Sequence, residues 1–138
     1  MLGRDAIESL LPHGGDMLLL DSVASWTERE IICLTNTHRY ANNPLRRGAC
    51  LPVFCGVEYG AQAMAIHGSL IGGNQVRAGI LGGLRDLVCH VERLDDIDGA
   101  LTVQASLLFG EQRSFLYAFA VRGAVGALVE GQASVFLT

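Results

Sequence analysis

The sequence predicts an α+β fold in which one antiparallel sheet of five to six strands wraps around one long central helix. Half of the 138 residues are hydrophobic, which suits a single domain, residues 1–138, with one core. An apolar helical segment spans roughly residues 52–70, and strand-like segments follow it to the end of the chain. Curling one sheet around one apolar helix is the economical way to bury both.

The elements follow from local patterns. Residues 4–11 predict a short amphipathic helix that stops at Pro12, and residues 17–23 and 29–36 predict two strands joined as a hairpin. A polar stretch, residues 37–49, precedes the long helix, which Gly72 and Gly73 should end. Four strand-like segments follow at 76–91, 100–110, 114–123 and 127–138. In the last three, apolar residues tend to alternate with small or polar ones, as half-buried antiparallel strands require.

Composition narrows the possible partners. Only 17% of residues are charged, all ten cations are Arg, and the net charge is −4, so we expect no nucleic-acid partner. No apolar run approaches the ~20 residues of a membrane span. We expect a cytoplasmic protein that is not a monomer, because so apolar a chain suggests a surface covered by another subunit.

Two further side-chain groups argue against a metal site. The four cysteines form no Cys-X-X-Cys pair and are expected to be buried free thiols. Asp95, Asp96 and Asp98 lack a ligand spacing and predict a polar turn.

The helical stretch "GVEYGAQAMAIHG", residues 56–68, contains one carboxylate, Glu58, which we expect in the middle of the most buried helix. A buried carboxylate is costly unless it is paired or protonated, so Glu58 has either a structural partner or a chemical role. Gln62 lies four residues on, on the same helical face, whereas His67 lies on the opposite face. Three alanines (Ala61, Ala63 and Ala65) should keep the helix slim enough for the sheet to approach closely.

The sequence resembles a known family in two long blocks. "IESLLPHGGDMLLLDSV" and "PVFCGVEYGAQAMAIHG" resemble the hotdog-fold 3-hydroxyacyl-acyl-carrier-protein dehydratases. "LPHGGDMLLLD", "NNPLR" and "GVEYGAQAMAIHG" resemble still more closely the dehydratase-like proteins of aryl polyene gene clusters.

The resemblance implies a hotdog fold and the loss of water from a 3-hydroxyacyl thioester to give the trans-2-enoyl product, in fatty-acid or aryl polyene type synthesis. The acyl group would be carried on the phosphopantetheine of acyl carrier protein, without a further cofactor. Glu58 matches the helix carboxylate that does proton work in the family. The implied substrate-binding residues are Gln62, Val53, Gly82, Gly83, Arg46 and Arg47. The two arginines could receive the acidic carrier protein or could be a solvated pair.

The chain departs from the family pattern at two positions. The family's catalytic histidine lies in the loop before the helix, but the matching segment here, Pro44 to Gly48, has none. Val53 stands where the family usually has a Gly whose amide faces the thioester. His38 is the nearby substitute for the base, with an ordinary strand-end histidine as the alternative.

Three functions remain open from the sequence. The chain is a dehydratase or dehydratase subunit, in a homodimer or in a heterodimer with a second hotdog subunit. Alternatively, it is a non-catalytic hotdog partner, or an acyl thioesterase that uses Glu58 to activate water.

Overall fold

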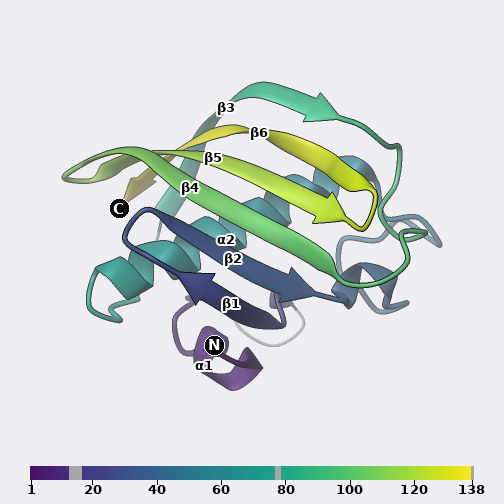
Figure 1. The fold of residues 1–138 in the computed structure, drawn as a ribbon, viewed down its shortest axis with the longest axis horizontal. Helices are drawn as coiled ribbons and strands as arrows, with labels where there is room; N and C mark the ends of the chain where they lie inside the picture. The colour runs from purple at the N-terminus through teal and green to yellow at the C-terminus, as the bar shows by residue number, and fades with distance from the viewer. Residues whose placement is uncertain (13–16, 77–78, 138) are drawn as a thin grey trace.

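The computed structural model describes residues 1–12, 17–76 and 79–137. Six antiparallel strands form one sheet in the order β1-β2-β4-β5-β6-β3, so β1 and β3 are its edges (Figure 1). The strands are β1 (Ser22–Trp26), β2 (Glu30–Thr35), β3 (Gly79–Cys89), β4 (Leu101–Glu111), β5 (Ser114–Gly123) and β6 (Gly126–Leu137). The helices are α1 (Arg4–Glu8) and α2 (Gly56–Ile71), with short 3-10 turns η2 (Thr37–Arg39) and η3 (Val53–Cys55). The predicted fold class is confirmed.

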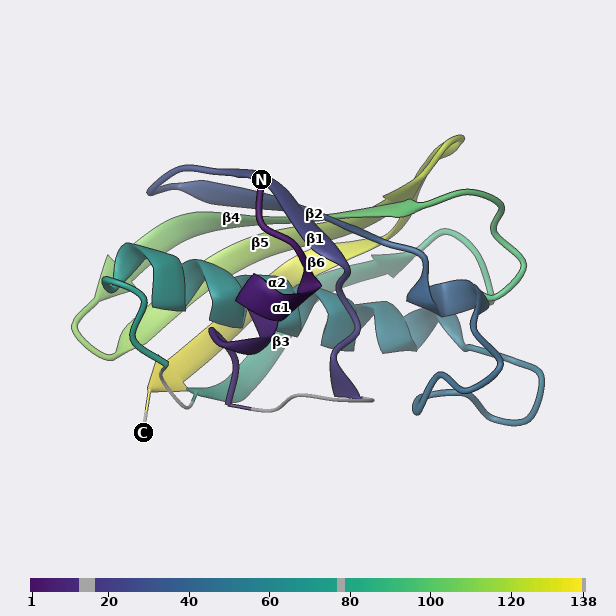
Figure 2. The same ribbon diagram turned by 90° about the horizontal axis from the view of Figure 1, so that it is seen from below.

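The long helix α2 lies along one face of the sheet (Figure 2). Two glycines permit this close packing: a Cβ at Gly60 would lie 2.8 Å from the ring of Phe119, and one at Gly56 would lie 2.5 Å from Val129. The helix ends where the sequence predicts, because Gly73 adopts φ +79 and the next amide bonds back to the carbonyl of Ser69.

The predicted strand at 17–23 is wrong for most of its length, since β1 begins only at Ser22. The backbone before it is bound by side chains instead. The Leu19 amide donates to the Gln62 side chain, and Arg4 donates to the carbonyls of Leu18 and Leu20. The predicted helix at 4–11 likewise ends early, at Glu8.

The core lies between α2 and the concave face of the sheet and includes one buried polar cluster. The hydroxyls of Thr35 and Thr37 both donate to the Leu19 carbonyl. Tyr59 on α2 bonds to Thr37 and to the amide of Asn43, so its hydroxyl joins the helix to the loop before it. This cluster satisfies polar groups that would be costly to bury alone.

The cysteines are free thiols, but the prediction that all are buried is wrong: Cys33 is buried, whereas Cys89 is exposed near the end of edge strand β3. In the described part of the chain, no helix is long and apolar enough to cross a membrane.

Candidate functional site

A groove with a volume of about 480 Å³ lies between one side of α2 and strands of the sheet. Its helix side is formed by residues spaced at three and four, from Glu58 at one end to Gly72 at the other. The opposite wall comes from β3, β5 and β6. The lining residues are Leu11, Pro12, Met17, Glu58, Ala61, Gln62, Met64, Ala65, Gly68, Ser69, Ile71, Gly72, Gly79, Leu81, Phe115, Tyr117, Val135 and Leu137.

Glu58 does not lie in the middle of a buried helix, so that prediction is wrong. Because α2 begins at Gly56, Glu58 is in the first turn, and its side chain is exposed in the single chain. A carboxylate in the first turn is stabilised by the positive end of the helix dipole. Within the described ranges, Glu58 forms no ion pair. It is free to act on a group held in the groove.

The other polar side chains of the groove are bonded within the chain. Gln62 accepts from the Leu19 amide and donates to the Met17 carbonyl, so its amide holds one rim of the groove. The Ser69 hydroxyl donates to the Leu10 carbonyl. Among the described residues, the groove is therefore an apolar surface with one available polar side chain, Glu58, at one end. Gln62 shares the groove with Glu58 as predicted, but both of its amide ends are occupied.

Tyr117 forms part of the groove wall and is fixed from behind by His67. The His67 ring donates from Nε2 to the Thr27 carbonyl at 2.8 Å and accepts from the Tyr117 hydroxyl at Nδ1, at 2.7 Å. Burial lowers the pKa of His67 and raises the pKa of Tyr117, so both groups are neutral at pH 7. The Tyr117 ring in this wall is therefore tied to α2 through His67.

His38 does not share the groove with Glu58. It is fully buried in η2, where Nε2 donates to the Ile97 carbonyl at 2.9 Å, and burial lowers its pKa. Its neighbour Arg39 bonds to the same carbonyl and to Asp98. Residues 38 and 39 thus fasten the turn between β3 and β4 to the loop before α2.

Of three further predicted residues, Val53 and Gly82 have structural contacts and Gly83 has none at its Cβ position. The Val53 amide donates to the Glu92 carbonyl at 3.0 Å, so it is not available to a thioester oxygen in this conformation. The Phe136 ring packs over Gly82 where a Cβ would lie. Gly83 has open space there, but neither glycine lines the groove, whereas Gly79 and Leu81 of the same strand do.

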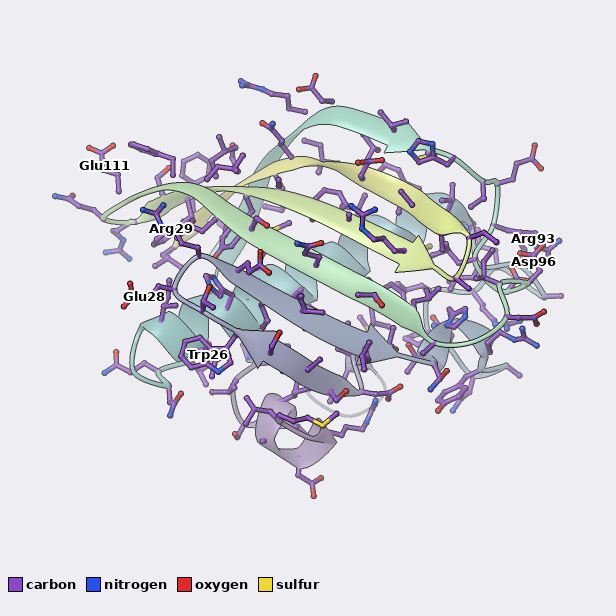
Figure 3. All side chains as sticks on the ribbon, in the orientation of Figure 1. Trp26, Glu28, Arg29, Arg93, Asp96 and Glu111 are labelled. Atoms are coloured by element: carbon purple, nitrogen blue, oxygen red, sulfur yellow. The ribbon has the colours of Figure 1, made fainter. Side chains whose placement is uncertain are left out.

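The predicted arginine pair lies in the loop that precedes α2. Arg47 is exposed, and Arg46 is half-buried with its guanidinium donating to the Ala49 carbonyl at 3.1 Å. Arg93 extends this cluster and donates to Ala49 and Asp95. Figure 3 shows Arg93 and Asp96 together at one end of the molecule, opposite Glu28 and Glu111. The bonds from Arg93 hold the pKa of the Asp95 carboxyl well below its usual range.

The groove wall was not predicted from the sequence. Phe115 and Tyr117 alternate along β5, and Val135 and Leu137 alternate along β6, so each pair faces the helix. That period-two pattern was visible in the sequence. The hydrogen bond between Tyr117 and His67 was not, because it joins residues 50 positions apart.

Solved structures share this fold. One chain of the dehydratase heterocomplex ApeI:P from Xenorhabdus doucetiae matches with a TM-score of 0.84 and 21% identity, over 96% of this chain and 90% of that chain. AziG from S. sahachiroi matches with a TM-score of 0.64 and 11% identity, over 84% of this chain and 89% of that one. Thioesterase HI1161 from Haemophilus influenzae matches with a TM-score of 0.57 and 11% identity, over 85% and 77%.

These likenesses establish the hotdog fold that the resemblance implied, and their identities are too low to establish more. Among curated proteins, none matches the chain. The family model described as ApeP dehydratase matches residues 5–138. The match covers nearly the whole chain, including the groove and Glu58, and the chain therefore belongs to the ApeP-like dehydratase family.

Proposed function

We propose that this chain is one subunit of a dehydratase that acts on 3-hydroxyacyl groups carried by acyl carrier protein, in aryl polyene type synthesis. The observation that carries the proposal is the carboxylate of Glu58, which forms no ion pair with any described residue, at one end of an apolar groove in a member of a dehydratase family. An apolar groove suits a hydrocarbon chain, and the carboxyl suits proton transfer at the end where the thioester enters.

Dehydration needs two proton transfers. A base removes the α-proton, and the electron pair forms the new double bond as the 3-hydroxyl leaves with a proton from an acid, which gives the trans-2-enoyl thioester and water. We assign the acid to Glu58. The burial of His38 and its bond to Ile97 favour a structural role for that histidine, so the base comes from elsewhere.

A second hotdog subunit can supply the base. The long strand β3 has one unpaired edge, and its exposed apolar side chains suit pairing with another sheet. The Xenorhabdus doucetiae structure is of a dehydratase heterocomplex, which supports pairing with a different subunit. Arg46 and Arg47, at the same end as η3 and the start of α2, would attract the acidic carrier protein and its phosphopantetheine.

The test compares the purified chain alone with its mixture with a hotdog dehydratase subunit that has the loop histidine. Each is given a 3-hydroxyacyl-carrier-protein substrate, and the products are identified by mass spectrometry. We expect the trans-2-enoyl product from the mixture and little or none from the isolated chain. The isolated chain could instead be fully active and lose that activity in His38→Ala. That result would overturn the assignment of the base to a partner.

The same assay distinguishes a dehydratase from a thioesterase. The likeness to thioesterase HI1161 is the reason to test this alternative. A thioesterase would release free acid and carrier protein with a free thiol. A chain that only holds the substrate would give neither product alone, and Glu58→Gln would leave the activity of the mixture unchanged, which would contradict the role of Glu58.

A further inference from the structure

The three glycines inside α2 have different surroundings. A Cβ on Gly56 or Gly60 would collide with side chains of the sheet, so these two are required for packing. A Cβ on Gly68 would meet nothing within 4 Å, and Gly68 does not have a positive φ. Neither packing against the described residues nor backbone conformation explains a glycine at this position.

Gly68 lines the groove. Glycine is unfavourable in a helix interior relative to alanine, so a glycine without a structural reason is an unexplained cost to the helix. What its missing side chain provides here is space in the groove. The wall beside it cannot easily move to compensate, because the Tyr117 hydroxyl is bonded to His67, the residue before Gly68.

The position of Gly68 along the helix indicates which part of an acyl chain would occupy that space. It lies ten residues from Glu58, which corresponds to about 15 Å along the axis of a helix. Ala65 lies on the same face about 4.5 Å nearer to Glu58. If the reacting carbons lie at Glu58, the far end of a long acyl chain passes Ala65 first and Gly68 later.

We propose that Gly68 determines the acyl chain length that the groove accepts, by leaving it open beyond Ala65. The inference rests on the proposed function, because it takes Glu58 as the place of the reacting carbons. A short acyl group ends before Gly68, and a long one extends across it. A larger side chain at residue 68 would close the groove to long chains.

Binding of pantetheine thioethers tests the proposal without turnover, because a thioether can be neither dehydrated nor hydrolysed. Calorimetry would compare S-butyl, S-octyl and S-tetradecyl pantetheine on the purified chain, alone and mixed with the histidine-containing hotdog subunit. Gly68→Leu should weaken S-tetradecyl binding by about tenfold or more relative to S-butyl binding. Ala65→Leu, three residues nearer to Glu58, should already weaken S-octyl binding.

Two further variants distinguish an effect on the space in the groove from an effect on folding. Gly68→Ala should raise Tm by about 2 °C, since the alanine suits the helix and meets no neighbour. Gly3→Leu, at an open glycine outside the groove, should leave the ratio of long-chain to short-chain binding unchanged.

Equal effects of Gly68→Leu on all three thioethers would overturn the proposal. The proposal would also be overturned if Ala65→Leu and Gly68→Leu excluded thioethers of the same chain length. Loss of subunit assembly in Gly68→Ala would show that the glycine accommodates a partner chain instead, and would also overturn it. A failure to dehydrate any substrate would count against the proposed function but would leave the chain-length order measurable.

Discussion

Glu58 differs from the other described polar side chains that line the groove, because its carboxylate makes no bond that holds the fold. Gln62 and Ser69 bond to backbone groups of the segment before β1, and Tyr117 bonds to His67. Replacing one of these would disturb the structure as well as the site. Glu58 can therefore be changed with the least structural cost, which makes its chemical role directly testable.

Glu58→Gln keeps the size of the side chain and removes its proton-transfer group. We expect the dehydration rate of the mixed complex to fall on the order of 10²-fold or more, with little change in Tm because the side chain is exposed. The measurement is steady-state turnover of the 3-hydroxyacyl-carrier-protein substrate. Glu28→Gln is the control, since Glu28 lies outside the groove. An unchanged rate in Glu58→Gln would assign the carboxylate to helix stabilisation only.

Among the elements, α2 has two faces with different demands. The face toward the sheet needs Gly56 and Gly60 for close packing, because a Cβ there would collide with Val129 or Phe119. The face toward the groove holds Gly68, where the cost of glycine in a helix, about 1 kcal/mol relative to alanine, is not offset by any contact with the residues that the structure describes. The helix therefore serves the core with one face and the ligand with the other.

The unpaired edge of strand β3 predicts how the chain assembles. Leu84 is 38% exposed on this strand, and a charge there would be buried if another sheet paired along β3. The wild-type chain should be a dimer or larger, alone or with its partner, and Leu84→Lys should shift it toward monomer. Light scattering at micromolar concentration measures the shift.

Val125→Lys is the matched control, because Val125 is 93% exposed in the turn between β5 and β6, away from the β3 edge. The Val125→Lys chain should form the same oligomer as the wild-type chain. A monomeric wild type under all conditions, including with the histidine-containing subunit, would contradict a site shared between two chains.

The sequence predicted the elements whose patterns are local. The alternation in β4, β5 and β6 and the glycines after α2 were sufficient because each depends on neighbouring residues. It failed for residues 17–20, whose backbone groups are bound by the side chains of Gln62 and Arg4. The same limit applies to His38, whose bond to Ile97 joins residues 59 positions apart. In both places the structure depends on side-chain contacts between residues far apart in the sequence, which local patterns do not reveal.

For the molecule as a whole, the buried histidines couple stability to pH. His38 and His67 are both fully buried, and burial lowers the pKa of each below its ordinary value of 6.5. In the unfolded chain they take up protons near pH 6.5, whereas the folded chain keeps them neutral to lower pH. Below that value the unfolded state binds more protons, so the free energy of unfolding must fall as the pH falls.

The expected result is a free energy of unfolding that is steady near pH 7.5 and falls between pH 6.5 and 5, by up to about 1.4 kcal/mol per pH unit for each histidine. This window lies above the range where Asp95 titrates, since the bonds from Arg93 hold the pKa of that carboxyl low. Urea unfolding at a series of pH values measures the slope. His67→Gln should lower stability at pH 7.5, because the glutamine fits the bonds to Tyr117 and Thr27 less well, and should reduce the slope between pH 6.5 and 5 by about half. A wild-type slope of zero in that window, or a slope that His67→Gln leaves intact, would mean that the buried histidines do not control the acid response of the fold.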